Sequence, residues 1–433
     1  MSRWRAAVLA SYAASGIAFA TWVSRLPAIR DGLNLTPGGI GLLLMCMTVA
    51  SFISISASGL IVLRLGPKLT TRIGSCMVGA GLVIVGVGTS IAANPLVVAA
   101  GLVVLGLGTA SWNTASNVEG ASLERELERH IMPHLHGAFS LGTVAAAGFG
   151  AWAAAVHMPV FRHFLISGVV VTASVVAATF WFRAEKTAAA TQTYRSKETD
   201  TFRDPSTGPL PIITPEPAAP RTEAGKAAAP LDNKRLVALA WRDRRTLLIG
   251  VLVLGLALAE GAAGDWVALA LALADGYGQS DAAGAVGYGL FVTFMTIGRF
   301  TGTVILDRFG RVVVMRWCSA TAVVGLALFV FAPVPWLAFV ALAVWGLGAS
   351  LGFPVGMSAA ADDPVHAAAR VSVVSTIGYG AFLCGPPLLG LLAEHFGILL
   401  SLLAPLALLV VSFFLAPLAG QQEAKSAQPS EAR

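Results

Sequence analysis

The chain has 433 residues, of which 56% are hydrophobic and 12% charged, and its mean hydropathy is +0.75. Soluble domains carry about 25% charged residues, so this composition excludes an ordinary water-soluble fold. The net charge of +6 comes from basic residues scattered along the chain, which argues against a nucleic-acid-binding domain.

Twelve membrane-spanning helices are predicted from apolar runs. About 20 such residues cross a hydrocarbon core about 30 Å thick. Two charge-free runs, 73–118 and 317–361, are long enough to cross twice, and Pro95 and Pro333 disfavour a continuous helix in them. The predicted spans are 6–24, 38–62, 73–92, 96–118, 136–156, 164–182, 246–270, 284–306, 314–332, 336–358, 371–393 and 397–416.

The basic residues orient these spans. With both termini on one side, all 29 Lys and Arg residues fall on that side except Arg25, Arg30, Arg162 and the intramembrane Arg299. Lys and Arg concentrate in cytoplasmic loops of membrane proteins. Both termini are therefore predicted to be cytoplasmic.

Residues 184–244 differ in composition from their surroundings, with seven prolines among Ala, Thr, Lys and Glu. Such a segment buries too little apolar surface to fold, so we predict a disordered cytoplasmic linker. Its last part, 233–245, is basic and contains Trp241, which favours a helix on the inner leaflet. The linker separates an N-terminal six-helix half, 1–183, from a C-terminal six-helix half, 245–416, and a cytoplasmic tail, 417–433, follows.

The two halves repeat each other. Arg64-Leu65-Gly66 follows the second span and Arg308-Phe309-Gly310 follows the eighth, each with another Arg eight residues beyond the first. A duplication in the same orientation is typical of transporters whose substrate path lies between the halves. The predicted fold class is an all-α membrane protein with twelve transmembrane helices in two pseudo-symmetric halves.

These features resemble the major facilitator superfamily, whose motif between spans two and three reads Gly-x-x-x-Asp-Arg-x-Gly-Arg/Lys. The first copy here runs from Gly59 to Lys68, with Leu63 in place of the Asp, and the second copy keeps Asp307. The resemblance implies that the Asp caps a helix end and that the basic residues pair across a cytoplasmic gate. The gating residues it implies are Arg64, Lys68, Asp307, Arg308 and Arg311.

Shorter phrases resemble the bacterial YbjJ and MosC-like permeases, which are distantly similar to sugar permeases. They include the segments 20–30, 113–117, 136–142, 259–266, 375–379 and 385–387. The resemblance implies a multi-pass permease of the bacterial cytoplasmic (inner) membrane, working as a monomer. Within these phrases, Trp22, Trp266 and Tyr379 are candidate substrate contacts.

Glu260 is the main candidate for proton coupling. It lies about 15 residues, or about 22 Å, into its span. A carboxylate there costs about 2.5–3.5 kcal/mol unless it faces a cavity or a partner, which suits a group that exchanges protons. A structural ion pair or a substrate acceptor is the alternative. Asp265, five residues on, is a candidate substrate contact or a helix-end residue.

Arg299 lies within the eighth span, about 12 Å from its cytoplasmic edge. It is expected to pair inward, with Glu260 or with backbone carbonyls, or to act in gating. The depth estimates for Arg299 and Glu260 differ by about 10 Å.

Asn113 and Asn117 share one face of the fourth span. They are candidates to bind a hydroxylated solute, and equally to join helices. His136 opens the fifth span and is either an interfacial histidine or a titrating gate residue. Glu119 is expected at a solvated helix end.

No metal site, cofactor or enzyme activity is predicted. The four cysteines are isolated, the histidines near residue 130 lack Cys or carboxylate companions, and no nucleophile–base pair is recognisable. The predicted function is secondary active transport of a small polar solute, sugar- or polyol-like, with protons as the coupling partner and the lipid bilayer as the surroundings. The alternatives are a proton-driven exporter of drugs or amphipathic metabolites, and a non-transporting receptor on a transporter scaffold.

Overall fold

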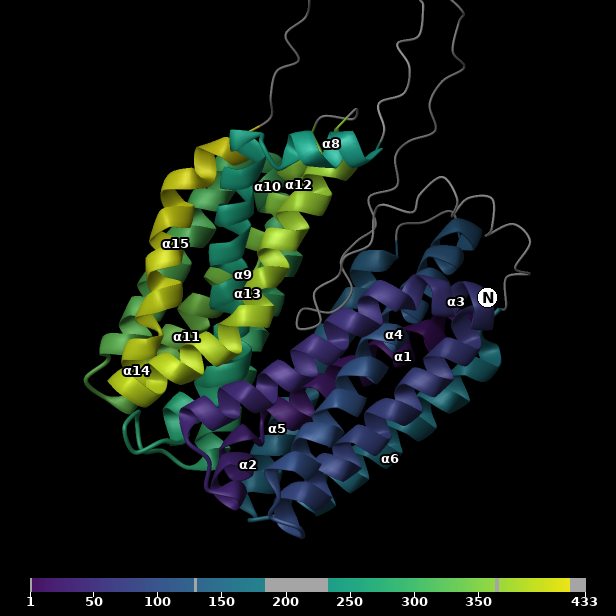
Figure 1. Ribbon diagram of the computed structural model, residues 1–433, viewed down its shortest axis with the longest axis vertical. Helices are drawn as coiled ribbons and strands as arrows, with labels where there is room; N and C mark the ends of the chain where they lie inside the picture. Colours follow the sequence, from purple (N-terminus) through teal and green to yellow (C-terminus); the bar gives the residue numbers. More distant parts are fainter. Residues whose placement is uncertain (1, 128–130, 184–232, 363–365, 421–433) are drawn as a thin grey trace, which may run out of the picture.

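The structure is a computed structural model that describes residues 2–127, 131–183, 233–362 and 366–420, and these residues form helices and short connections (Figure 1). The first part of the chain contains α1 (Ser2–Val23), α2 (Leu26–Leu33), α3 (Pro37–Ser90), α4 (Pro95–Leu127), α5 (Met132–Ala155), α6 (Val160–Ala178) and η1 (Thr179–Trp181). The second contains α8 (Asn233–Ala240), α9 (Arg244–Ala272), α10 (Asp281–Phe331), α11 (Pro335–Ala349), α12 (Gly352–Ala360), α13 (Ala367–Phe396), α14 (Ile398–Ser401), α15 (Leu403–Leu415) and η2 (Ala416–Ala419).

The twelve predicted crossings are consistent with these helices. Among the described residues, 11 helical stretches are long and apolar enough to span a membrane. One of them, α3, has 54 residues, which at 1.5 Å per residue is about 81 Å and crosses twice. Gly66 divides α3 with φ of 77°, and Gly310 divides α10 in the same way with φ of 75°. Glycine adopts this left-handed conformation without steric strain.

Glycine contacts repeat between the halves. A Cβ added to Gly81 of α3 would lie 2.8 Å from Leu105 N of α4, and one added to Gly325 of α10 would lie 2.6 Å from Trp345 Cα of α11. At both places the missing side chain lets two helix backbones approach closely. The packing therefore confirms the internal duplication.

Two helical bundles make up the molecule (Figure 1). The N-terminal bundle contains α1–α6 and the C-terminal bundle contains α9–α15. We call the end that carries Trp4, Arg183 and Arg245 the terminal face, and the end that carries α2 and α14 the distal face. The bundles meet toward the distal face and diverge toward the terminal face in Figure 1.

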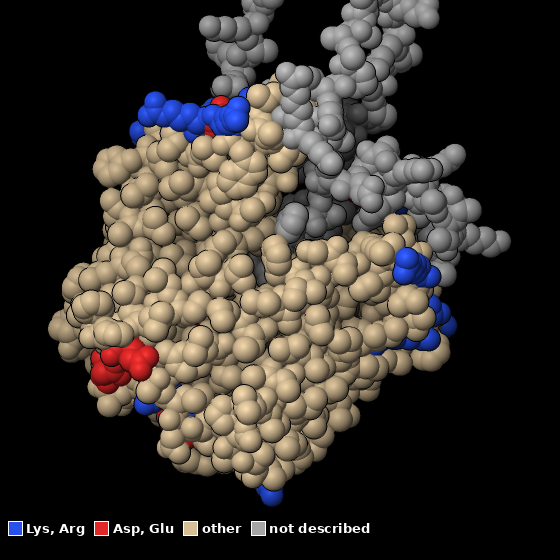
Figure 2. All heavy atoms as spheres, viewed as in Figure 1, with Lys and Arg blue, Asp and Glu red and all other residues tan. Residues whose placement is uncertain are grey.

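The membrane-facing surface is apolar. Figure 2 shows Lys and Arg toward opposite ends of the visible face, and the surface between them is uncharged apart from an acidic patch at the left edge. Large aliphatic and aromatic side chains are exposed along the spans, including Leu42, Val304 and Phe414. Exposed apolar area of this extent is what lipid contact requires.

One helix lies within the segment predicted as a linker. The eight-residue α8 precedes α9, and Ala240 at its end is buried in a small apolar cluster with Ala369 and Val373 of α13. Leu239 and Trp241 are exposed beside it, as expected for an interfacial helix. The remainder of the predicted linker, 184–232, and of the predicted tail, 421–433, lies outside the described residues.

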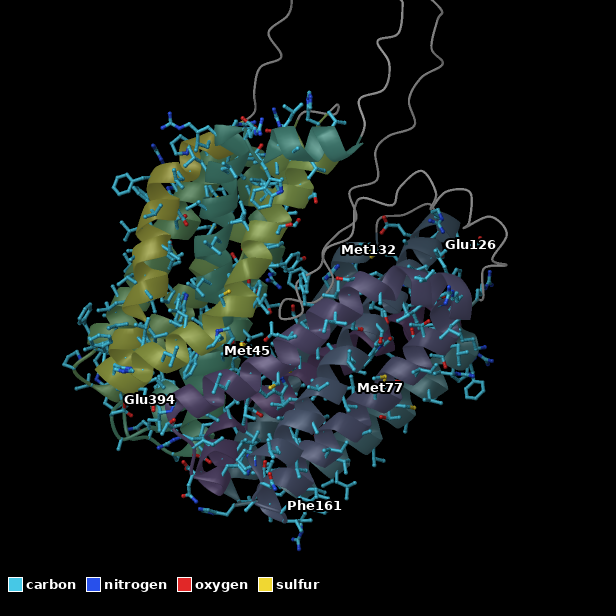
Figure 3. All side chains as sticks on the ribbon, viewed as in Figure 1. Met45, Met77, Glu126, Met132, Phe161 and Glu394 are labelled. Atoms are coloured by element: carbon cyan, nitrogen blue, oxygen red, sulfur yellow. The ribbon has the colours of Figure 1, made fainter. Side chains whose placement is uncertain are left out.

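The bundles pack tightly at the distal face. A Cβ added to Gly41 of α3 would lie 2.6 Å from the Pro386 carbonyl oxygen of α13, and one added to Gly390 would lie 2.8 Å from the Pro37 carbonyl oxygen. Glu394 lies against Gly38 at the start of α3, where Figure 3 shows the two bundles meeting. Glycines at these positions therefore allow the distal ends of the bundles to close.

We expect Gly41→Val to open the distal face, because its side chain would overlap the backbone of α13. Spin labels on Ala92→Cys and Trp336→Cys, in a background without the four native cysteines, report the separation of the two bundles there. The distance distribution should shift to longer values. Gly148→Val is the matched control, since an added Cβ at Gly148 meets nothing within 4 Å. An unchanged distribution in Gly41→Val would contradict the role of this contact.

Candidate functional site

A break in a predicted span leaves one carbonyl inside the C-terminal bundle without its usual helical donor. The span predicted at 336–358 is divided into α11 and α12, with Ser350 and Leu351 between them. Pro354 lies four residues after Ser350 and has no N–H, so the Ser350 carbonyl lacks its usual helical donor. Arg299 Nε of α10 donates to this oxygen at 3.3 Å. A side chain from another helix thus replaces the missing backbone hydrogen bond.

The same arginine pairs with Glu260. Arg299 Nη2 lies 2.8 Å from Glu260 Oε1, and their side chains are 25% and 7% exposed. The structure therefore brings together two residues whose estimated depths differ by about 10 Å. That estimate treats both helices as perpendicular to the membrane and ignores helix tilt and the length of the arginine side chain.

Aromatic and acidic groups surround this ion pair. The buried Tyr288 of α10 is in electrostatic contact with Glu260 and with the half-buried Asp265. Tyr379 of α13 packs on Phe353 of α12, with ring centroids 6.1 Å apart. Tyr288 therefore lies beside both acids, and the Tyr379–Phe353 contact lies on α12, whose start Arg299 reaches.

The two predicted asparagines join helices within the N-terminal bundle. Ser15 Oγ of α1 donates to Asn113 Oδ1 at 2.7 Å, and Tyr12 OH donates to Asn117 Oδ1 at 2.6 Å. Asn117 Nδ2 also donates to the Asn113 carbonyl at 2.7 Å. Of the two interpretations of these residues, these contacts favour helix joining over solute binding in this conformation.

The two predicted tryptophans lie in the apolar core. Trp22 and Trp266 are 1% and 0% exposed. Trp22 lines a small apolar cavity with side chains of α2, α3 and α4. Neither indole ring offers an accessible face to a solute in this conformation.

The predicted gate residues differ in their contacts and in their exposure. Arg311 pairs with Asp362, which also lies 3.6 Å from Arg245 Nη2, so these contacts join helices of one bundle. This differs from the expected pairing across the gate, because the acid that Arg311 meets belongs to its own bundle. The other motif residues lie at the surface: Arg64, Asp307 and Arg308 are exposed and Lys68 is partly exposed.

Asp243 caps the start of α9 and is the second acid near the terminal face with several partners. It accepts hydrogen bonds from the Thr246 side chain at 2.6 Å and from the Thr246 N–H, and lies 3.5 Å from Arg370 Nε. Burial raises the pKa of this carboxyl, but the Thr246 hydrogen bonds and the Arg370 charge outweigh burial and hold it below its usual value. The helix start is thus fixed by an ionised cap at neutral pH.

The prediction for Glu119 was wrong. Glu119 is fully buried and accepts hydrogen bonds from Trp4 Nε1 at 2.7 Å and from the Arg183 N–H at 2.9 Å. These two residues, which lie far from Glu119 in the sequence, cover the end of α4. His136 packs nearby, with its ring centroid 5.7 Å from that of Tyr12.

Two features of the structure were not predicted from the sequence. The Ser350 carbonyl was missed although Pro354 in an otherwise regular span signals it. Arg25 falls in a predicted loop, but it is buried and its Nη2 donates to the Met158 carbonyl at 2.8 Å, facing the charge of Asp281 in the other bundle. Within the described ranges, no group of three His, Cys, Asp or Glu residues is placed to hold a metal ion.

Comparisons with known proteins agree with this architecture. A model of the Major Facilitator Superfamily matches residues 261–433. The chain is 26% identical to the uncharacterized transporter y4wD of Sinorhizobium fredii over 91% of its own length and 92% of that protein. It is 22% identical to the membrane protein MosC of Rhizobium meliloti, over 94% and 87% of the two chains.

A solved structure extends the comparison to the fold. The crystal structure of the nucleoside transporter NupG has a TM-score of 0.66 to this chain at 15% identity, covering 96% of this chain and 100% of that one. The helix order, the duplicated bundles and these relatives lead to one conclusion: over most of its length this chain is similar to membrane transporters of the major facilitator superfamily.

Proposed function

We propose that the protein transports a small polar organic solute, sugar- or polyol-like, together with protons. The observation that carries the proposal is the buried pair of Glu260 and Arg299 beside the broken helix. Charged residues at this depth are expensive, and in membrane proteins they mark substrate or proton pathways. Discontinuous helices are likewise where transporters build their binding sites.

Proton coupling follows from the chemistry of the pair. An ionised Glu260 holds Arg299 by a charge-assisted hydrogen bond. A protonated Glu260 releases most of that attraction and frees arginine donors for solute oxygens. Because binding free energies are reciprocal, a solute that takes the donors of Arg299 also favours the uptake of a proton by Glu260.

The groups around the pair suit a hydroxylated ring. Arg299 supplies donors, Asp265 supplies acceptors, and Tyr379 combines a phenol with a ring face. NupG, which shares the fold, is named as a nucleoside transporter, and nucleosides are solutes of this polar, ring-containing kind.

Alternating access gives this site its two entrances. The bundles are packed together at the distal face and diverge toward the terminal face. The distribution of Lys and Arg supports a cytoplasmic location for the terminal face in a bacterial inner membrane. In this proposal, the conformation seen here opens to the cytoplasm, and the transporter works as a monomer.

Glu260→Gln should abolish solute accumulation driven by a pH gradient, because glutamine cannot exchange a proton. Exchange of solute at equal pH should persist. The measurement uses purified protein in liposomes, with sugars, polyols and amphipathic cations as the panel. Glu126→Gln is the matched control, since it removes an exposed acid that pairs with Arg183 at 3.3 Å. Full accumulation by Glu260→Gln would remove the proton-coupling assignment, and a response limited to amphipathic cations would indicate drug export.

Arg299→Gln should destabilise the protein by about 3–5 kcal/mol, because it leaves the Glu260 carboxylate buried without its partner. The double variant with Glu260→Gln should regain most of this loss. The free energy of unfolding in mixed micelles provides the measurement. A double variant no more stable than Arg299→Gln would show that the two side chains do not act as a pair.

A further inference from the structure

Helix α12 is held at both ends by arginines of other helices. At its start, the Ser350 carbonyl accepts from Arg299 Nε at 3.3 Å. Just after its end, Asp362 pairs with Arg311 of α10 and with Arg245 of α9. This nine-residue helix therefore runs from the buried ion pair to the ionic contacts of the terminal face.

The connection of α12 to α11 is weak. Ser350 N donates to Leu347 O at 3.4 Å, and the next helical bond is from Val355 N to Leu351 O at 3.1 Å. Pro354 has no N–H to donate to Ser350. Because backbone hydrogen bonding is interrupted here, α12 can change its tilt without disturbing α11.

Two glycines of α12 form its contact with α9. Gly352 and Gly356 face α9, and a Cβ added to Gly352 would lie 2.7 Å from Leu256 Cδ1. Phe353 anchors the helix on its other side by packing on Tyr379 of α13. Small residues at such an interface allow close approach without interlocking side chains. Arg299 supplies a polar connection between the start of α12 and Glu260 of α9.

That connection depends on the charge of Glu260. Arg299 contacts the Glu260 carboxylate through Nη2 and the Ser350 carbonyl through Nε. Tyr288 of α10 and Asp265 of α9 are titratable groups near Glu260, and Tyr379 of α13 packs on Phe353 of α12. α12 itself has no charged residue, and the shared arginine connects its start to Glu260.

We propose that α12 is the element that transmits the protonation of Glu260 to the ionic contacts of Asp362 at the terminal face. With Glu260 ionised, Arg299 bridges α9 and the Ser350 carbonyl and holds the start of α12. With Glu260 protonated, the bridge is lost, α12 loosens and the Asp362 contacts weaken. Pro354 is a positioning residue in this scheme, because it leaves the Ser350 carbonyl open to Arg299. The inference rests on the proposed proton coupling.

Hydrogen–deuterium exchange tests the link at the level of the helix. Glu260→Gln mimics the protonated acid and should speed exchange of the α12 amides about fivefold or more, the lower end of typical coupling between sites. Pro354→Ala restores a backbone donor to Ser350 and should remove this response, so that its combination with Glu260→Gln exchanges like Pro354→Ala alone. Equal exchange of α12 in the wild type and Glu260→Gln would overturn the proposal.

Transport by the same variants separates this inference from the proposed function. Pro354→Ala should exchange solute at equal pH but lose accumulation driven by a pH gradient. Pro405→Ala, at a proline near the start of α15, is the matched control and should keep both activities. If Glu260→Gln loses accumulation while Pro354→Ala retains it in full, proton coupling stands and the role of α12 is refuted. If Glu260→Gln itself retains accumulation, both proposals fail.

Discussion

The ion pair between Glu260 and Arg299 is the interaction on which the C-terminal bundle depends. Its two charges lie inside a membrane-spanning bundle, where separate burial of either would cost several kcal/mol. Replacing such a pair by apolar residues is often neutral for stability, so stability alone does not account for it. Unlike apolar packing, the pair connects α9, α10 and the start of α12 through hydrogen bonds to a titratable carboxyl group.

The two halves of the duplication have diverged around this interaction. Trp22 and Trp266, Gly66 and Gly310, and Gly81 and Gly325 are each separated by 244 residues, and the same spacing matches Glu260 with Gly16. Gly16 packs against the backbone of α5 near Phe139, where no side chain fits. The N-terminal bundle thus uses this position for close packing, and Asn113 and Asn117 join α1 to α4 with neutral hydrogen bonds. Its buried acid, Glu119, accepts from the Trp4 indole N–H and the Arg183 backbone N–H, whereas Glu260 pairs with an arginine side chain.

Local signals in the sequence predicted the spans and the duplication, and they offered Glu260 and backbone carbonyls as alternative partners of Arg299, whereas the structure shows both contacts. Runs without charge are long and depend only on neighbouring residues, so the twelve crossings could be predicted. The pairing of Arg299 with Glu260 depends on helix tilt and side-chain reach, which no spacing encodes. Glu119 was misjudged because its partners, Trp4 and Arg183, come from distant parts of the chain. Pro354 did signal the break, but proline also occurs in continuous transmembrane helices.

The two faces of the molecule are held by different contacts, and in the proposed transport cycle this difference decides which contacts a solute or proton must change. The distal face is closed between the bundles by the contact of Gly41 with α13, with Arg25 and Asp281 facing each other from opposite bundles. The ionic contacts described at the terminal face, those of Asp362, Asp243 and Glu126, each lie within one bundle. A ligand shifts such an equilibrium only by its difference in affinity for the two states. In the proposed mechanism, a proton on Glu260 acts within the C-terminal bundle and changes the shape of that bundle first and the contact between the bundles second. This order places the proposed coupling residue in α9 rather than at either face.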